Sequence, residues 1–328
     1  MEDDFSSAKT IFIHDYLLVF GATILFWDHI LTFGDEVKYI WLRPKLLSSY
    51  WFFLNRYVGL LGNIAVITLG FTILTPTVCK RYNVYRQILL VVNEVLVVVL
   101  LSLRIYALYN KSRIILVTML GSASALLALA IWALLGQKVA PSQLPLSISR
   151  GCHIPFPQER AIRLAVPWEA LLVYDTLIFS LTLWKSWSMR NYLTTGKGKR
   201  SSNPLLMIMF RDGTIYYGVM VLATMANVLT YYTMPPNMKG GLSMLASSIS
   251  VTMMSRLMLN LHATSDEGLY STTHLTVNTE DTYLDLHPLH RVPHTGEVEL
   301  DTLMTADLSF GLSRGGVEGG HEAHSSRP

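Results

Sequence analysis

The sequence predicts an all-α integral membrane protein, a bundle of seven transmembrane helices followed by a disordered acidic tail. Seven apolar stretches of about 20 to 27 residues each fill residues 11–262. A helix rises 1.5 Å per residue, so about 18 apolar residues or more can cross a hydrocarbon core of ~30 Å. The composition agrees, because 51% of the residues are hydrophobic and only 15% are charged, with a mean hydropathy of +0.36. A soluble chain carries nearer a quarter charged residues.

Glycine and proline mark the joins between these stretches and set the bounds of the seven expected helices. In chain order, the helices and the breakers at or after their ends are 11–33 (Gly34, Pro44), 50–75 (Pro76), 84–109, 113–136 (Gly136, Pro141), 163–187 (Gly196, Gly198), 204–231 (Pro235, Pro236, Gly240, Gly241) and 241–262. The third and fourth helices should be antiparallel neighbours, because only residues 110–112 connect them. The short segment 1–10 is acidic and lacks the basic start of a signal peptide, so we expect the first helix to direct its own insertion.

Charge divides the chain into a basic core and an acidic tail. Residues 1–262 hold 23 Lys and Arg against 12 Asp and Glu, a net charge of +11, whereas residues 263–328 hold 3 against 11, a net of −8. The tail has no long apolar run and cannot bury enough surface to offset its ordering entropy, so we expect it to be disordered. Three of its histidines have ligand-like spacing, but no fold preorganises them, and we expect neither a metal nor a cofactor. These are His287, His290 and His294.

The two cysteines favour an orientation with the N-terminus outside and the C-terminus in the cytosol, most simply at the plasma membrane. Cys79 and Cys152 would then lie in outer loops, where an oxidising compartment lets them form a disulfide; the alternative is two unrelated free thiols. Basic residues alone do not decide, with ten inside and nine outside, although the cluster at 197–200 favours the inside. The sequon at Asn110 would face inward and is expected to stay unmodified.

Ionisable residues within five of the expected helices lie at one depth, about 8–12 Å from the inner helix ends. Charges inside a membrane suggest function or buried pairing, and two aspartates among four arginines suggest an interhelical salt-bridge network. The alternative is that the arginines reach the lipid headgroups. The residues of this inner layer are Asp28, Arg56, Arg104, Arg211, Asp212 and Arg256.

A middle layer holds Asn63, Glu94 and Asp175, from the second, third and fifth helices. A carboxyl at this depth with no arginine level with it should be neutral, or should face water or a cationic ligand. One hypothesis is a ligand or proton-binding pocket in the outer half of the bundle, with Glu169 nearer its mouth. The other is neutral carboxyls hydrogen-bonded between helices.

Several sequence motifs of membrane enzymes and pigments are missing. The expected helix 241–262 has no lysine for a retinal Schiff base, and the chain has no histidine-rich box, Gly-rich phosphate loop or Gly-x-Ser-x-Gly turn. We therefore expect no enzyme activity, and no nucleic-acid partner.

Three segments carry a resemblance to a known family. They are Tyr16-Leu17-Leu18 through Trp27-Asp28-His29 to Trp41, the sequence 103–109, and the sequence 255–262. The chain resembles a large family of uncharacterised membrane proteins of mushroom-forming fungi, which implies a seven-span protein and no particular ligand.

A looser similarity is to G-protein-coupled receptors, from the helix count, the cysteine positions, Arg104 near the inner end of the third helix, and the basic loop before the sixth. The sequence departs from the best-known receptors in having Leu103 before Arg104 and no Asn-Pro-x-x-Tyr motif. Coupling to a G protein is therefore an analogy of topology.

Three functions remain open. The leading hypothesis is a receptor-like protein that contacts the lipid bilayer, binds an unknown small molecule from outside, and engages cytosolic partners through residues 188–203 and the tail. The second is a transporter or proton-coupled channel that uses Glu94 and Asp175 as relay groups. The third is a structural or trafficking membrane protein in which the charges only specify helix packing.

Overall fold

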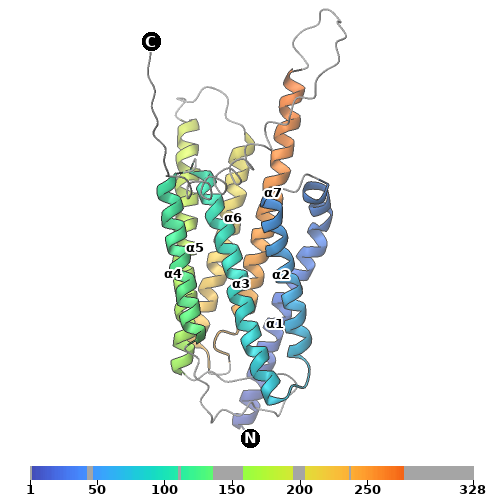
Figure 1. Cartoon of the computed structure of the whole chain (residues 1–328), viewed down its shortest axis with the longest axis vertical. Helices are drawn as coiled ribbons and strands as arrows, with labels where there is room; N and C mark the ends of the chain where they lie inside the picture. Colours follow the sequence, from blue (N-terminus) through green and yellow to red (C-terminus); the bar gives the residue numbers. More distant parts are fainter. Residues whose placement is uncertain are drawn as a thin grey trace, which may run out of the picture.

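The computed structural model describes residues 2–42, 47–109, 112–135, 158–194, 204–235 and 238–276, and these form an all-α bundle. α1, α3, α5 and α7 begin at the end of the bundle where the chain starts, called here the N-terminal end, and α2, α4 and α6 run the other way (Figure 1). The elements are α1 (Glu2–Glu36), a π-helix η1 (Val37–Trp41), α2 (Leu47–Gly70), α3 (Pro76–Leu108), α4 (Arg113–Leu135), α5 (Gln158–Thr194), α6 (Pro204–Thr233) and α7 (Ser243–Thr276).

Six of the described helices are long and apolar enough to cross a membrane, which makes the chain a multi-pass membrane protein. The spans are Lys9–Trp41, Ser48–Gly70, Pro76–Leu108, Arg113–Ala133, Ala161–Ser188 and Gly213–Thr233. The expected bundle of seven helices is present, and α7 is the one of the seven that is not among these six candidate spans. The reason is local: α7 carries five serines, a threonine and Arg256 in its first half, and it packs against α1, α2, α3 and α6. Its surroundings are mostly protein, so it does not need the hydropathy of a lipid-facing helix.

The helices differ from the expected bounds mainly at prolines and at chain ends. α3 begins at Pro76, eight residues before the expected start at 84. Proline suits the first turn of a helix, because the N–H groups of that turn have no partner within the helix and its lack of one costs no hydrogen bond. α1 continues through η1 to Trp41, past the expected end at Gly34. α7 continues to Thr276, so the expected start of the tail at 263 lies within this helix; residues 277–328 lie outside the described parts, and their expected disorder stays a prediction.

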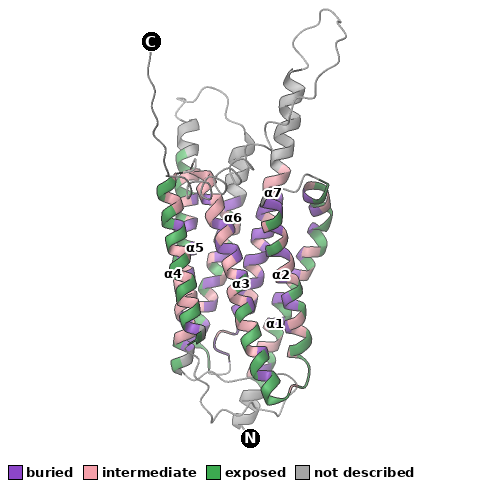
Figure 2. Cartoon of the chain, in the orientation of Figure 1, coloured by how far each residue is buried: buried purple, intermediate pink, exposed green. Residues whose placement is uncertain are grey.

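The centre of the bundle is where α3 and α7 meet. Buried side chains of both helices, including Leu101, Ile105, Val251 and Met254, form one apolar cluster with residues of α1, α2, α5 and α6. Figure 2 shows buried residues concentrated on these two helices and exposed residues along the outer side of α4. α4 packs against α3 and α5, and only 6% of the residues in its most apolar stretch are buried. It therefore lies at the edge of the bundle.

We expect Gly21→Ala to destabilise the protein, because at this residue α1 contacts the backbone of α7. A Cβ added there would lie 2.9 Å from the Cα of Leu245, which cannot move without shifting the helix. The predicted loss is about 1–3 kcal/mol, the usual range for overpacking, measured as thermal unfolding of the purified protein. Gly34→Ala on the same helix is the control: a Cβ there meets nothing within 4 Å, so that variant should be as stable as the wild type or slightly more stable. Equal losses for both variants would contradict the close approach.

Candidate functional site

A buried ion pair joins α1 to α2 near the end of the bundle opposite the N-terminal end. Arg56 Nε lies 2.7 Å from Glu36 Oε2, and the side chains are only 3% and 0% exposed. Placing two charges in so dry a site requires that their remaining hydrogen-bonding groups also find partners. The surrounding residues supply them.

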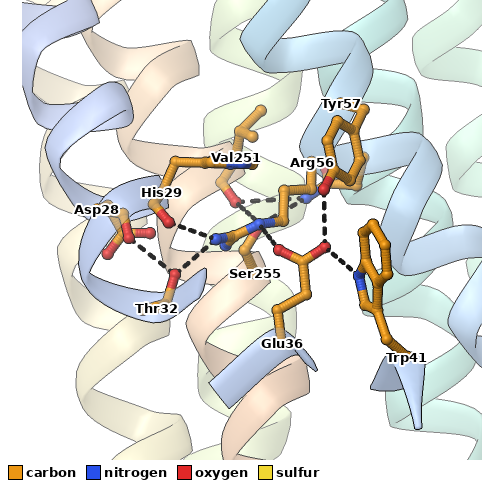
Figure 3. Close-up of polar contacts among 10 residues, drawn as sticks. Asp28, His29, Thr32, Glu36, Trp41, Arg56, Tyr57, Val251 and Ser255 are labelled. Atoms are coloured by element: carbon orange, nitrogen blue, oxygen red, sulfur yellow. Dashed lines mark hydrogen bonds and ion pairs between the residues drawn. The ribbon is translucent and has the colours of Figure 1, made fainter. Parts of the chain in front are cut away.

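Hydrogen bonds from three elements surround this pair (Figure 3). Trp41 Nε1 of η1 and the Tyr57 hydroxyl of α2 both donate to Glu36 Oε1, at 2.9 and 3.0 Å. Arg56 Nη2 donates to Thr32 Oγ1 at 2.7 Å and to the carbonyl oxygen of His29 at 3.1 Å. The π-helix therefore has a role, since it turns Trp41 back toward the carboxylate that precedes it.

A second ion pair connects α1 to α7. Asp28 pairs with Arg256 Nε, and the aspartate is 6% exposed while the arginine is 38% exposed. Asn55 on α2 extends the contact, because its Nδ2 donates to the carbonyl oxygen of Val251 and to Ser255 Oγ, both at 3.3 Å. Together these contacts hold α1, α2 and α7 at one depth. We call Asp28, Glu36, Arg56 and Arg256 the ion-pair network.

The structure brings together some residues of the expected inner layer and separates others. Asp28 pairs with Arg256, but Arg56 pairs with Glu36, which was not among the residues expected in this layer. Arg104 contacts α6 instead: its guanidinium lies 5.5 Å from the centre of the Tyr217 ring. Arg211 and Asp212 belong to α6, and their side chains lie outside what the structure describes, so their expected pairing stays a prediction.

Glu36 was missed because the first helix was expected to end at Gly34. A carboxylate just past a helix end is normally solvated, and only the continuation of the helix through η1 brings it back over Arg56. The available signal was Trp41, an aromatic donor five residues after the acid. A glycine in a transmembrane helix is weak evidence for a helix end, since glycine is common there.

The residues of the middle layer occupy different environments. Asp175 of α5 is buried and accepts a hydrogen bond from Thr224 Oγ1 of α6 at 3.2 Å. Glu94 of α3 contacts Ser247 of α7 and lies within electrostatic range of Asp175. Asn63, by contrast, donates to the carbonyl oxygen of Gly59 in its own helix, at 2.8 Å.

The fourth expected ligand residue, Glu169, lies nearer the N-terminal end and accepts a hydrogen bond from the hydroxyl of Tyr232. This contact joins α5 to α6. Of the four residues expected in the pocket, Glu94 and Asp175 are therefore both buried in the interior, within electrostatic range of each other, whereas Asn63 and Glu169 make separate contacts.

The side of α3 and α7 that faces the interior carries further polar groups. Asn93 and Ser248 are each 1% exposed, and their side-chain polar atoms have no protein hydrogen-bond partner among the described residues; the same holds for the hydroxyl of Thr252. Buried polar atoms usually find partners in protein or in ordered water, so these groups make this part of the interior polar.

A cavity of about 320 Å³ lies between α3, α4, α5 and the connection from α6 to α7. Its walls are mainly valine, leucine and alanine side chains. The polar residues include Arg86 and Glu94 of α3, Tyr231 of α6, and Lys239 and Ser243 at the start of α7. The cavity thus lies in the half of the bundle away from the ion-pair network, and Glu94 is the one expected ligand residue in its wall. The expected pocket included Asn63 of the second helix, whereas the described wall contains residues of α4 and none of α2.

Cys79 lies in the first turn of α3, at the N-terminal end, where it is 2% exposed. It is not a free thiol. Cys152 lies outside the described residues, so the pairing of the two cysteines stays a prediction.

The helices and their composition define a multi-pass α-helical membrane protein. Residues 16–61 match a protein family of unknown function, DUF6533. The matched part includes most of α1, all of η1 and the first half of α2, and it contains three of the four residues of the ion-pair network, with Arg256 the exception. No curated protein matches the chain.

We expect Glu36→Gln to cost about 3–5 kcal/mol of folding free energy, because it leaves the Arg56 guanidinium charged and unpaired in a dry site. The neighbouring exposed residue provides a matched control: Asp35→Asn removes the same charge from the same turn and should change stability by no more than about 0.5 kcal/mol. The measurement is denaturant unfolding of both variants in the same detergent or lipid disc. If the two substitutions have equal effects, the pair does not stabilise the α1–α2 hairpin as the geometry indicates.

Proposed function

We propose that the protein is a receptor-like membrane protein, which binds a small molecule in the cavity between α3, α4 and α5 and transmits this event to the opposite end of the bundle. The cavity is the observation that carries the proposal. Ligand sites are typically concave, apolar and about 300–1,000 Å³, with a few polar groups that orient the ligand. This cavity, at about 320 Å³, has apolar walls and polar residues concentrated toward one end.

Two helices connect the cavity with the far end. α3 contributes Arg86 and Glu94 to the cavity and carries Arg104 two to three turns further on. α6 contributes Tyr231 to the cavity and carries Tyr217 and Gly213 beside Arg104. A Cβ on Gly213 would lie 2.7 Å from Arg104 Nη2, so the two helices touch closely there. A ligand that separates α3 from α6 at the cavity would therefore alter this contact, which is how small shifts become helix rearrangements.

The proposed orientation places the cavity outside and the Arg104 contact inside. Cys79, which is not a free thiol, lies at the N-terminal end, and disulfides are typical of oxidising compartments. The connection between α5 and α6 and the acidic tail then face the cytosol, where residues 188–203 and the tail would contact a signalling partner. The plasma membrane is the membrane that best suits such a receptor.

A second candidate function is proton-coupled transport, favoured by two interior carboxyls, Glu94 and Asp175, within electrostatic range of each other. The two carboxyls come from different helices. Glu94 of α3 has the hydroxyl of Ser247 of α7 as a neighbour, and Asp175 of α5 has the hydroxyl of Thr224 of α6. Chains of carboxyls and hydroxyls inside a membrane are typical of proton pathways. A purely structural role would need neither these groups nor the cavity.

We expect Ala130→Phe to abolish ligand binding and Arg104→Gln to preserve binding but abolish its transmission. Ala130 lines the cavity, so a ring there fills it, whereas Arg104 lies at the far end. Binding is measured as thermal stabilisation by compounds of a small-molecule library, and transmission as ligand-dependent hydrogen exchange in residues 183–194 and 204–216. Ala128→Phe, on an exposed part of α4 outside the cavity, is the control. If no compound separates these variants, or if every variant only lowers the amount of folded protein, the receptor proposal is wrong and the charges specify packing.

For the transport alternative, Glu94→Gln should abolish pH-driven flux in proteoliposomes while the amount of folded protein stays the same. Glutamine keeps the shape and the contact with Ser247 but cannot exchange a proton. A pH-sensitive dye inside the vesicles reports the flux. Asp15→Asn, which changes a carboxyl outside the cavity on α1, is the control. A wild-type protein without flux in this assay rules out the transport alternative and leaves the receptor proposal in place.

A further inference from the structure

We propose that the cavity takes its ligand sideways from the bilayer, and that this ligand is a lipophilic molecule with one hydrogen-bond-donating group, which binds Glu94. The inference rests on the proposed function, because it assigns a ligand class and an entry route to the same cavity. Three features of the cavity carry it: the exposed wall on α4, the apolar lining, and the carboxyl of Glu94.

The α4 wall of the cavity is also part of the outer surface of the protein. Leu120 and Leu127 line the cavity, yet they are 66% and 39% exposed. In the other walls, Val98 of α3 and Leu171 of α5 are buried. The cavity is partly open, and its exposed side is therefore the one that α4 forms.

This exposed wall lies at the depth of the lipid hydrocarbon. α4 can cross the membrane as Arg113–Ala133, and Leu120 and Leu127 lie about 10 and 21 Å along a span of about 30 Å. At that depth an exposed side chain meets lipid rather than water. A molecule dissolved in the bilayer therefore reaches the α4 wall directly.

Most of the lining is hydrocarbon. Val91, Val95 and Val98 follow one face of α3, and leucine and alanine side chains of α4 make up most of the facing wall. A lipophilic molecule that moves from lipid into this site exchanges one apolar environment for another, so it gains little from the hydrophobic effect. Its affinity then depends on packing and on a polar contact that lipid hydrocarbon does not provide.

Glu94 offers such a contact. It lines the cavity and is not fully enclosed, and its Oε1 has no hydrogen-bond partner among the described residues. Rotation about the last bond of the side chain can present either carboxyl oxygen to the cavity. The other interior carboxyl, Asp175, already accepts a hydrogen bond from Thr224 Oγ1. A hydroxyl or ammonium group on the ligand would supply the missing donor, and in a site of low dielectric this hydrogen bond is stronger than in water.

The test uses a long-chain alcohol that carries a diazirine and an alkyne in its chain, with the full-length protein in lipid discs. Irradiation and peptide mapping should place the label in residues 87–99 of α3 and 120–133 of α4. We expect hexadecanol and hexadecylamine to compete with this probe. Hexadecyl methyl ether, which has no donor, should need a mole fraction in the lipid about tenfold higher or more.

Variants at Glu94 test the polar contact. In Glu94→Leu the preference for the alcohol over the ether should be lost, because the acceptor is gone while the partition of both molecules into the lipid is unchanged. Glu94→Gln keeps an acceptor without the negative charge, so it should retain competition by the alcohol and weaken competition by the amine. A preference that persists in Glu94→Leu overturns the assignment of Glu94 as the anchor.

A substitution in the exposed wall tests the entry route. Leu127→Trp places a larger side chain in that wall and should slow labelling severalfold. Ile131→Trp is the matched control: Ile131 lies one turn further along α4 and is 45% exposed, but it does not line the cavity. Equal labelling rates in the two variants contradict sideways entry.

The outcomes separate this inference from the proposed function. If soluble compounds lose binding in Ala130→Phe but the probe labels neither α3 nor α4 of the wild type, the cavity is a ligand site reached from water, and only the inference fails. If neither the soluble compounds nor the probe respond to Ala130→Phe, both proposals fail. Thermal unfolding confirms that each variant is folded.

Discussion

Much of the described structure depends on the way in which a buried arginine is neutralised within a membrane helix. Arg56 is 3% exposed in a helix that is long and apolar enough to cross the bilayer. The desolvation free energy of its guanidinium is offset only by a carboxylate that has hydrogen bonds of its own. Glu36 provides the carboxylate, and η1 brings Trp41 to hold it. The hairpin of α1 and α2 therefore has one register, and α7 is joined to the same level through Asp28 and Asn55.

The division of the bundle into two ends follows from this arrangement. At one end ion pairs fix α1, α2 and α7; at the other, α3, α4 and α5 leave a cavity with cationic residues at its N-terminal end. α3 and α6 pass along both regions and meet at Arg104, Gly213 and Tyr217. The matched family segment, residues 16–61, belongs to the fixed part rather than to the cavity.

The sequence was sufficient for the helices and insufficient for most contacts. Apolar length determines a membrane helix almost alone, so the all-α bundle could be predicted. Charge inside a helix drew attention to Asp28, Arg56 and Arg256, which lie in ion pairs in the structure. Partners are decided by rotation about each helix axis and by the exact helix ends, which hydropathy does not report. Glu36 was missed because a π-helix continues α1, and α4 was missed as a cavity wall because its leucines look the same whether they face lipid or a ligand.

The weak hydropathy of α7 has a consequence for biogenesis. Its serines and Arg256 make it a poor substrate for direct partition from the translocon into lipid, because arginine within a membrane span opposes insertion. It is also the last helix of the bundle to be synthesised, so its four neighbouring helices are already made when it emerges. α7 is therefore expected to enter the membrane by packing against these helices, with Arg256 pairing with Asp28 and its serines facing the polar side of α3. Insertion of this helix and folding of the bundle would then be the same event.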